Sequence, residues 1–233
     1  MSVLLPILLA LLAAPPTASD TLGVSPSPAR AVKVTTGSAH TLSVSGTSGT
    51  VTTRMPGNDA ILLGMDIDES GDAPCEVELY WWRENGDSAP QGIFETTFTL
   101  CGTPFNASGL VAVGHDSGSL QYRYFSAPEY VYYAAHGVRT CHNRAGTRVK
   151  GVRLFGSTIN QDNDREVRRD PALKRDFERT NCNTWQTVRK CPAGEVVVGI
   201  DIHTSGTSIT GLAPKCATVS VVQDNSAGTR RSN

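Results

Sequence analysis

Two octapeptides in this chain are nearly the same, and they constrain its fold more than any other feature. Gly64 to Gly71 reads GMDIDESG, and Gly199 to Gly206 reads GIDIHTSG. Each copy follows an apolar run of three residues, and glycine, aspartate, isoleucine, serine and glycine recur at matching positions. Self-similarity of this kind arises when one structural unit is used more than once. The sequence therefore predicts a fold built from repeated units.

Weaker matches extend the repeat to four candidate units. An apolar run that ends at a glycine follows each of four starting points: Met55, leading to Gly64; Cys101, leading to Gly114; Cys141, leading to Gly151; and Cys191, leading to Gly199. Each unit reads as a short strand, a turn, an apolar strand and a return strand. Such antiparallel motifs are repeated in prisms, trefoils and propellers. Apolar runs before glycine are also common in any β protein, which is the alternative reading.

The rest of the chain has the texture of β-structure. Residues 76–81 alternate polar and apolar side chains, and residues 94–100 are rich in threonine and aromatic residues, as strands are. We therefore expect an all-β fold of pseudo-repeated antiparallel units, a β-prism or a related sandwich or barrel, as a single domain over residues 32–222.

One charged segment departs from this texture. Residues 160–179 carry eleven acidic and basic side chains within the stretch from Asp162 to Glu178 and few apolar ones. Val167, Leu173 and Phe177 would form one narrow helical stripe, and proline is a good first residue of a helix. The segment is interpreted as a solvated insertion with a short helix near residues 165–178.

The N-terminus predicts secretion. Residues 3–14 form a short apolar run, and residues 15–19 are mostly small, as at the cleavage site of a signal peptide over residues 1–19. About 12 apolar residues are too few to span a bilayer, so a membrane anchor is not favoured. We expect a secreted, extracellular protein with no membrane span. A Ser/Pro-rich leader at 20–31 and a tail at 223–233 are expected to be flexible.

The cysteine count agrees with this compartment. Six cysteines follow the predicted signal peptide, and an even count in a secreted chain favours three disulfides. We prefer the sequential pairing, because each bond would then staple a local unit: Cys75–Cys101, Cys141–Cys182 and Cys191–Cys216. The absence of any CxxC pair in the sequence argues against a thiolate metal site. Asn106 begins an N-glycosylation sequon, which predicts a glycoprotein with an exposed loop at that point.

The charge balance argues against nucleic acid as a partner. The chain has 21 Lys and Arg against 22 Asp and Glu, and no tail or face stands out as strongly basic. Proteins that bind nucleic acid usually show a basic patch. An extracellular glycan or a coat or matrix protein is the expected partner instead.

The C-terminal unit has the most specific pattern. Trp185 is followed by Cys-Pro-Ala-Gly at 191–194, a valine-rich strand ending at Gly199, and an apolar strand ending at Cys216. Residues 185–216 thus resemble the repeat of the vitelline membrane outer layer protein I family, and residues 147–154 are similar to a second copy of its strand. The resemblance implies a β-prism of Greek-key sheets around a pseudo-threefold axis, in a secreted protein of an extracellular coat. It implies no catalytic residue.

The first octapeptide offers a candidate cation site. Asp66, Asp68 and Asp72 supply oxygen ligands near a glycine, as at the start of a calcium loop. An EF-hand is excluded, because Val77 stands where the bidentate glutamate belongs. A looser Ca²⁺ site at a strand-to-turn corner is one interpretation, and no other cofactor is indicated. The other interpretation is structural: Asp66 and its counterpart Asp201 would cap the turn by accepting backbone hydrogen bonds.

The aromatic residues give the better clue to function. Tyr80, Trp81 and Trp82 are consecutive, so on a strand they cannot all point inward, and at least one ring is expected to be exposed or covered by a loop. Exposed rings beside acidic residues suit sugar rings or a protein partner. Trp81, Trp82, Asp66 and Asp68 are therefore the candidate ligand-binding residues, with core packing of the rings as the alternative.

Catalysis is the less favoured class of function. The sequence has no nucleophile elbow, no HExxH and no phosphate-binding loop, and the adjacent His115, Asp116 and Ser117 cannot meet in a triad. We expect a non-catalytic structural, coat or glycan-binding protein, lectin-like in action. Two alternatives stay open: a polysaccharide-active hydrolase built from distant carboxylates, and a secreted toxin or host-interaction factor.

Overall fold

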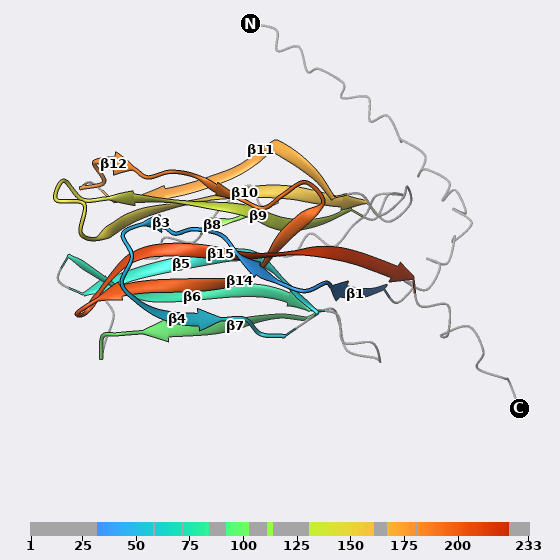
Figure 1. Ribbon diagram of the computed structural model, residues 1–233, viewed down its shortest axis with the longest axis horizontal. Coiled ribbons are helices and arrows are strands. Elements are labelled where there is room, and N and C mark those ends of the chain that lie inside the picture. Colours follow the sequence, from blue (N-terminus) through green and yellow to red (C-terminus); the bar gives the residue numbers. More distant parts are fainter. Residues whose placement is uncertain are drawn as a thin grey trace, which may run out of the picture.

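A computed structural model describes residues 32–57, 59–70, 72–83, 92–102, 111–113, 131–160, 167–179 and 181–223. All regular structure in these ranges is β-strand, paired antiparallel (Figure 1). Within the same ranges, no helix is long and apolar enough to cross a membrane. The predicted signal peptide, the leader up to residue 31, Asn106 and residues 224–233 of the predicted tail lie outside the described residues.

The strands form three sheets. Sheet I has the order β7-β6-β5-β8, from β5 (Ala60–Ser70), β6 (Ala73–Arg83), β7 (Gly92–Thr99) and β8 (Val111–Ala112). Sheet II has the order β11-β10-β9-β12, with β13 also on β9, from β9 (Val131–His142), β10 (Val149–Asn160), β11 (Val167–Glu178), β12 (Thr184–Trp185) and β13 (Arg189–Lys190). Sheet III has the order β1-β15-β14-β4, with β2 and β3 also on β15, from β1 (Val32–Thr36), β2 (His40–Thr41), β3 (Ser45–Gly46), β4 (Thr50–Arg54), β14 (Glu195–Ser205) and β15 (Ser208–Gln223).

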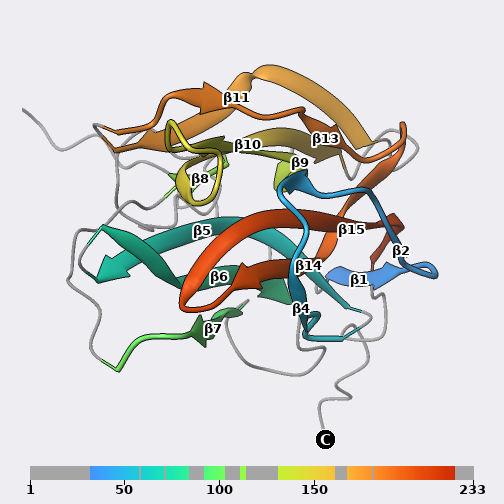
Figure 2. The ribbon, with the colours of Figure 1, turned by 60° about the vertical axis from the view of Figure 1, so that its left-hand side comes forward.

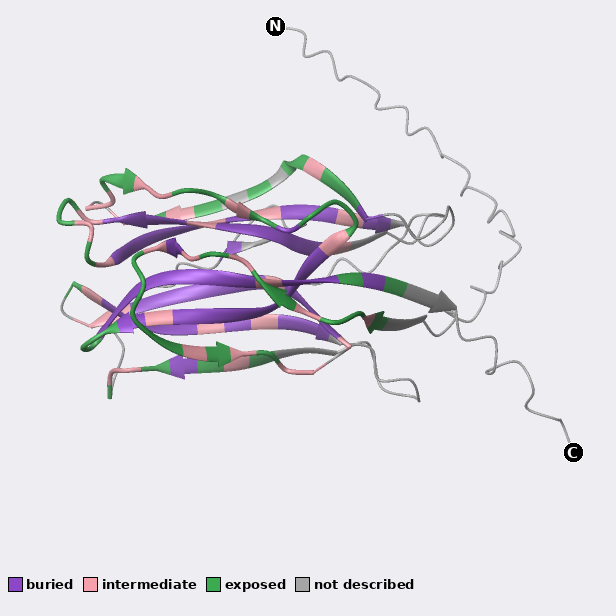
Figure 3. Cartoon of the chain, viewed as in Figure 1, coloured by how far each residue is buried: buried purple, intermediate pink, exposed green. Residues whose placement is uncertain are grey.

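A long hairpin forms the middle of each sheet: β5–β6, β9–β10 and β14–β15. The first strands of the three hairpins contact one another pairwise, and Figure 2 shows sheet II lying over the other two. The main hydrophobic core takes residues from all three hairpins, and the buried segments follow the central strands in Figure 3. Three antiparallel sheets around a shared core are what the β-prism resemblance implies.

The three hairpins share two β-bulges, which define the repeat. In the first strand of each, one residue before a glycine has no cross-strand partner: Leu63 before Gly64, His136 before Gly137, and Val198 before Gly199. In each return strand, a second residue is skipped near the turn: Cys75, Lys150 and Thr210. The likeness of Gly64 and Gly199 is thereby confirmed as structural equivalence.

The predicted four-unit repeat needs correction to three. Gly151 follows the second bulge of its hairpin, so it corresponds to Gly211 rather than to Gly199. The true third copy of the first strand centres on Gly137. The unit predicted to start at Cys101 supplies only the two-residue strand β8 among the described residues, and Gly114 lies outside them. Close packing requires the glycines, since a Cβ on Gly137 would lie 2.7 Å from the carbonyl oxygen of Arg189.

The alternation predicted for residues 76–81 decides which side chains enter the core. Val77, Leu79 and Trp81 point inward and are fully buried. Glu76 and Glu78 point to the opposite, outer face, because successive strand residues alternate. Burying one such apolar side chain contributes about 1.5–3 kcal/mol, so this pattern fixes which face of β6 meets the core.

The predicted helix at 165–178 is wrong, because this segment is strand β11. Val167 pairs with Ile159 and Phe177 with Val152, so these apolar residues belong to a strand rather than to a helical stripe. Pro171 lies where the pairing with β10 is interrupted, between the partners of Phe155 and Ser157. β11 is an edge strand, and proline and charged side chains are typical of edges, where they discourage pairing with other chains.

The disulfides follow the preferred sequential pairing. Cys75 is bonded to Cys101, Cys141 to Cys182 and Cys191 to Cys216. The first bond lies in sheet I and the second in sheet II. The third links sheet II to sheet III, because Cys191 follows β13 and donates its backbone N–H to His136 on β9, whereas Cys216 lies on β15. The described residues contain no free cysteine.

Candidate functional site

The two tryptophans predicted to bind a ligand are buried. Trp81 has no exposed surface, lies in the main core and donates a hydrogen bond of 2.7 Å from Nε1 to Thr96 Oγ1. Trp82 is 4% exposed and lies in a second buried cluster, reached from the opposite face of β6. The three consecutive rings do not all enter the main core: Trp82 packs on the opposite face of β6, and Tyr80 is half-buried. The core-packing alternative describes both rings.

Asp66 and Asp68 belong to an acidic ladder on the outer face of sheet I. Asp66 lies directly opposite Glu78 on β6, and Asp68 lies opposite Glu76. Asp68, Glu76 and Glu78 each place one oxygen within 4.8 Å of the others, so they form the carboxylate group that could hold a cation. Like charges directly opposite each other destabilise a sheet. The ladder therefore works against the stability of the hairpin that carries it.

The ladder also perturbs a neighbouring phenol. Tyr80 donates a 2.8 Å hydrogen bond from its hydroxyl to Glu78 Oε2. Burial of the hydroxyl, this bond and the nearby carboxylates raise the pKa of Tyr80 well above its ordinary value. Tyr80 thus stays a neutral hydrogen-bond donor, and it contributes no charge to this face.

Asp72 is separated from the other predicted calcium ligands by its own contacts. The side chain of Lys150 is completely buried, and its Nζ lies 2.5 Å from Asp72 Oδ1 and 3.0 Å from Glu69 Oε2. Asn181 Nδ2 also donates to Asp72 Oδ1 at 2.5 Å. Hydrogen bonds from Lys150 and Asn181 hold the pKa of Asp72 below its usual value. This network joins the turn of sheet I to sheet II, so the structure uses Asp72 as an inter-sheet anchor.

Asp201, the counterpart of Asp66, makes side-chain contacts on sheet III. Thr53 donates a 2.5 Å hydrogen bond to Asp201 Oδ1, and Lys215 Nζ lies 3.2 Å from Asp201 Oδ2. These contacts pair neighbouring strands rather than cap a turn. At the equivalent position of sheet II, two residues after the bulge glycine, stands Arg139.

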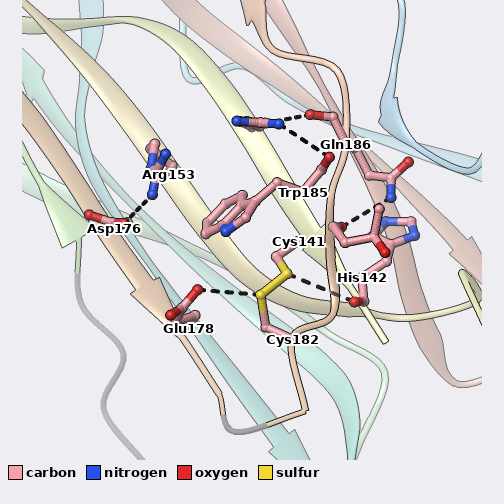
Figure 4. The surroundings of a disulfide bond; sticks show 10 residues. Cys141, His142, Arg153, Asp176, Glu178, Cys182, Trp185 and Gln186 are labelled. Atoms are coloured by element: carbon pink, nitrogen blue, oxygen red, sulfur yellow. Dashed lines mark hydrogen bonds and ion pairs between the residues drawn. A yellow bond between two sulfur atoms is a disulfide. The ribbon is translucent and has the colours of Figure 1, made fainter. Parts of the chain in front are cut away.

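Arg139 belongs to a cationic cluster on the outer face of sheet II. Figure 4 shows Arg153 and the Trp185 ring of this cluster. Arg153 lies directly opposite Arg139, and both guanidinium groups lie near the Trp185 ring, at 4.4 Å and 5.7 Å from its centroid respectively. Arg139 donates from Nη2 to the Trp185 carbonyl at 3.2 Å and from Nε to that of Gln186. Arg153 forms an ion pair with Asp176. We call Arg139, Arg153 and Trp185 the Arg–Trp cluster.

The cationic face extends beyond this cluster. Lys190 Nζ lies 4.5 Å above the centroid of the Phe155 ring, on the neighbouring cross-strand row. In the described parts of residues 131–191 there are twelve Lys and Arg against three Asp and Glu. The described parts of residues 60–113 contain one Lys or Arg against seven Asp and Glu. The near-zero net charge of the whole chain thus averages over segments of opposite sign.

Sequence reasoning missed the Arg–Trp cluster as a site. The sequence pattern marks Trp185 only as the aromatic residue of a repeat, and it does not single out Arg139 or Arg153. The signal that could have found them is the local excess of Lys and Arg between residues 131 and 191, which whole-chain composition conceals.

A serine–histidine pair in sheet II has no access to solvent. Ser157 Oγ lies 2.9 Å from His136 Nδ1, and the two residues are 0% and 3% exposed. Burial, aided by the positive charges of Arg169 and Lys190, lowers the pKa of His136 to about 4. A substrate cannot reach this pair in the closed core, so its contact is structural.

No protein-family model and no curated protein matches the chain. Among solved structures, it is similar to Calystegia sepium agglutinin, with 11% identity over 77% of this chain and 97% of that chain and a TM-score of 0.46. It is also similar to Calsepa lectin in complex with a biantennary N-glycan, with 11% identity, coverage of 77% and 97% and a TM-score of 0.45. A single-chain recombinant jacalin is also similar, with 10% identity over 78% of this chain and 95% of that chain and a TM-score of 0.38. These likenesses are distant, so we base the function on the chain's own residues.

Proposed function

We propose that this protein is a secreted, non-catalytic glycan-binding protein that acts outside the cell, and that it binds its ligand on the outer face of sheet II. The observation that carries the proposal is the Arg–Trp cluster. Two guanidinium groups lie against one indole ring on a sheet face, and one of them is fixed by backbone carbonyls. A preorganised pair of planar donors suits the many acceptor oxygens of a saccharide.

The surroundings of the cluster support binding rather than turnover. The side chain of Arg153 is 19% exposed, so part of it reaches solvent, while its Nε is buried and has no hydrogen-bond partner among the described residues. The only serine–histidine pair described above is buried, and Asp66, Asp68 and Glu76 are each less than 9% exposed. Fixed donors at a surface and buried candidate acids suit a protein that holds a glycan without cleaving it.

The compartment forms part of the same proposal. It comprises a signal peptide over residues 1–19, a flexible leader and tail, glycosylation at Asn106, and a role in an extracellular coat like that of the vitelline membrane outer layer protein I family. Three disulfides support it, because such bonds form and persist in oxidising compartments. Sequencing the N-terminus of the secreted protein tests it directly, and a mature chain that begins at Met1 would reject this part.

A glycan array tests the binding function. We compare the wild type with Trp185→Ala, which removes the ring under the guanidinium groups, and with Val51→Ala, an exposed apolar residue on sheet III as the matched control. We expect the first variant to lose binding and the control to keep it. Absence of any glycan signal for the folded wild type would reject the proposal, and release of cleaved product from a bound glycan would favour the hydrolase class.

A further inference from the structure

We infer that the ligand of sheet II is an anionic polysaccharide, carboxylated or sulfated, and that the Arg–Trp cluster and Lys190 together recognise its acidic groups. This inference rests on the proposed glycan-binding function and narrows it to one chemical class. It starts from the segregation of charge between the sheets, which leaves sheet II strongly positive and sheet I negative.

Among the residues that the structure describes, only half of the charge of the Arg–Trp cluster is compensated. Arg139 and Arg153 are directly opposed across the strands, an arrangement that costs stability on its own. Asp176 pairs with Arg153, whereas the hydrogen-bond acceptors of Arg139 are uncharged carbonyl oxygens. One carboxylate thus serves two guanidinium groups. A carboxylate or sulfate of a ligand would supply the missing charge, and a guanidinium group can donate paired hydrogen bonds to two oxygens of either anion.

The cations are spread in a way that fits a polymer better than a single sugar. Lys190, Gly137, Phe155 and Lys174 form one cross-strand row over four neighbouring strands. With strands about 4.8 Å apart, this row spans about 14 Å. Arg139 and Arg153 form the next row on the same face, about 7 Å along the strands. Only a chain with repeated acidic groups can meet both rows at once.

Two observations favour a polysaccharide over nucleic acid. The disulfide inside sheet II suits an oxidising, extracellular setting. Proteins that hold single-stranded nucleic acid stack bases on open aromatic rings. Here the two rings on the face are each covered by a cation, Trp185 by Arg153 and Phe155 by Lys190. The rings therefore support the cations instead of presenting a stacking surface.

The test measures binding of the full secreted protein to four immobilised polymers: heparin, polygalacturonate, neutral dextran and double-stranded DNA. We expect binding to the first two, weakening as salt rises because charge pairs are screened. The double variant Arg153→Gln/Lys190→Gln should bind about tenfold or more weakly, which corresponds to loss of one strong charge contact. The control Arg144→Gln/Arg54→Gln removes the same charge from the β9–β10 turn and from sheet III, and should change binding by less than about threefold.

The variant Arg153→Lys separates loss of charge from loss of fold. It keeps the positive charge but loses the paired donors of the guanidinium, so it should bind more weakly than the wild type and more tightly than the double variant. Circular dichroism confirms that each variant is folded. Binding of dextran but of neither polyanion would overturn the inference and leave the proposed function standing. Absence of binding to every polysaccharide would overturn both. Tighter binding to DNA than to heparin, or equal losses in the test and control variants, would also overturn the inference.

Discussion

Sheets I and II are built on the same hairpin but present opposite charges. Asp66 and Arg139 occupy equivalent positions, two residues after the bulge glycine, and each faces a residue of its own sign, Glu78 and Arg153. The inward residues of the two hairpins are alike in being apolar and buried. The comparison teaches that the core and the bulges preserve the fold, while the outer positions are free to acquire opposite chemistries.

The largest expected change is the difference in stability lost when Trp81 of sheet I or Trp185 of sheet II is replaced. Trp81→Ala should destabilise the protein by about 3–5 kcal/mol, because it opens a large cavity in the core. Trp185→Ala should cost less than half as much, since the ring is only partly buried. Urea unfolding followed by circular dichroism measures both. Equal losses of stability would contradict the assignment of one ring to the core and the other to a functional face.

The next largest effect is the pH dependence of stability that comes from His136, the bulge residue of sheet II. His136 stands where sheets I and III have Leu63 and Val198. Its folded pKa of about 4 lies below the unfolded value of 6.5, so the stability that depends on neutral His136 is complete above pH 6.5 and is lost as pH falls towards 4. The loss amounts to up to about 3 kcal/mol.

The variant His136→Leu/Ser157→Ala tests this by making the sheet II bulge as apolar as the others. Unfolding free energies measured from pH 7 to pH 4 should fall less steeply in the variant than in the wild type. An unchanged slope would show that His136 is not the titrating group.

The contact between the two sheets gives a smaller effect. Lys150→Met should cost about 1–3 kcal/mol, because Glu69 and Asp72 lose a buried hydrogen-bond donor. The wild type keeps the stabilisation from Asp72 above the ordinary pKa of 3.8 and loses it as pH falls through the lower folded value. In the variant, the pKa of Asp72 should return towards 3.8. Carboxyl titration by NMR measures this pKa. An Asp72 pKa that is the same in the variant and the wild type would contradict the proposed contact with Lys150.

The smallest expected changes in stability have opposite signs on the outer faces of sheets I and II. Glu76→Gln should stabilise the protein by about 0.2–1 kcal/mol at pH 7, because it removes one of two opposed carboxylates. Arg139→Gln should instead destabilise it, since the guanidinium holds the backbone at Trp185 and Gln186. Thermal melts in chelator-treated buffer measure both. If calcium stabilised the wild type and Glu76→Gln abolished that gain, the acidic ladder would be a cation site after all.

The sequence was sufficient to predict the hairpins of sheets I and III, because both copies keep an aliphatic run before the bulge glycine. The sheet II copy was missed, since Ala134, Ala135 and His136 replace that run, and because the glycine of its return strand, Gly151, imitates the pattern. The error at β11 has a related cause. A strand interrupted at Pro171 loses its period of two, and its three apolar residues then fit a helical spacing by chance.

The candidate site depended on information that local patterns do not hold. The chemistry of Trp185 comes from Arg139 and Arg153, which lie on two other strands. Only the registers of β9 with β10 and β12 bring the three residues together. By contrast, the disulfide pairing could be predicted, because the partners of each bond are close in the sequence, with separations of 26, 41 and 25 residues.

The composition of sheet III has a consequence for how the chain matures. Its strands β1 and β4 come from the start of the described chain, yet they pair with β15 and β14 at the end. During synthesis from the N-terminus, sheets I and II can close with their own disulfides as they emerge, whereas β1 and β4 must wait for the last hairpin. The final disulfide, Cys191–Cys216, therefore forms in the segment whose arrival completes the molecule, so it can close only after both strands of the last hairpin have been made.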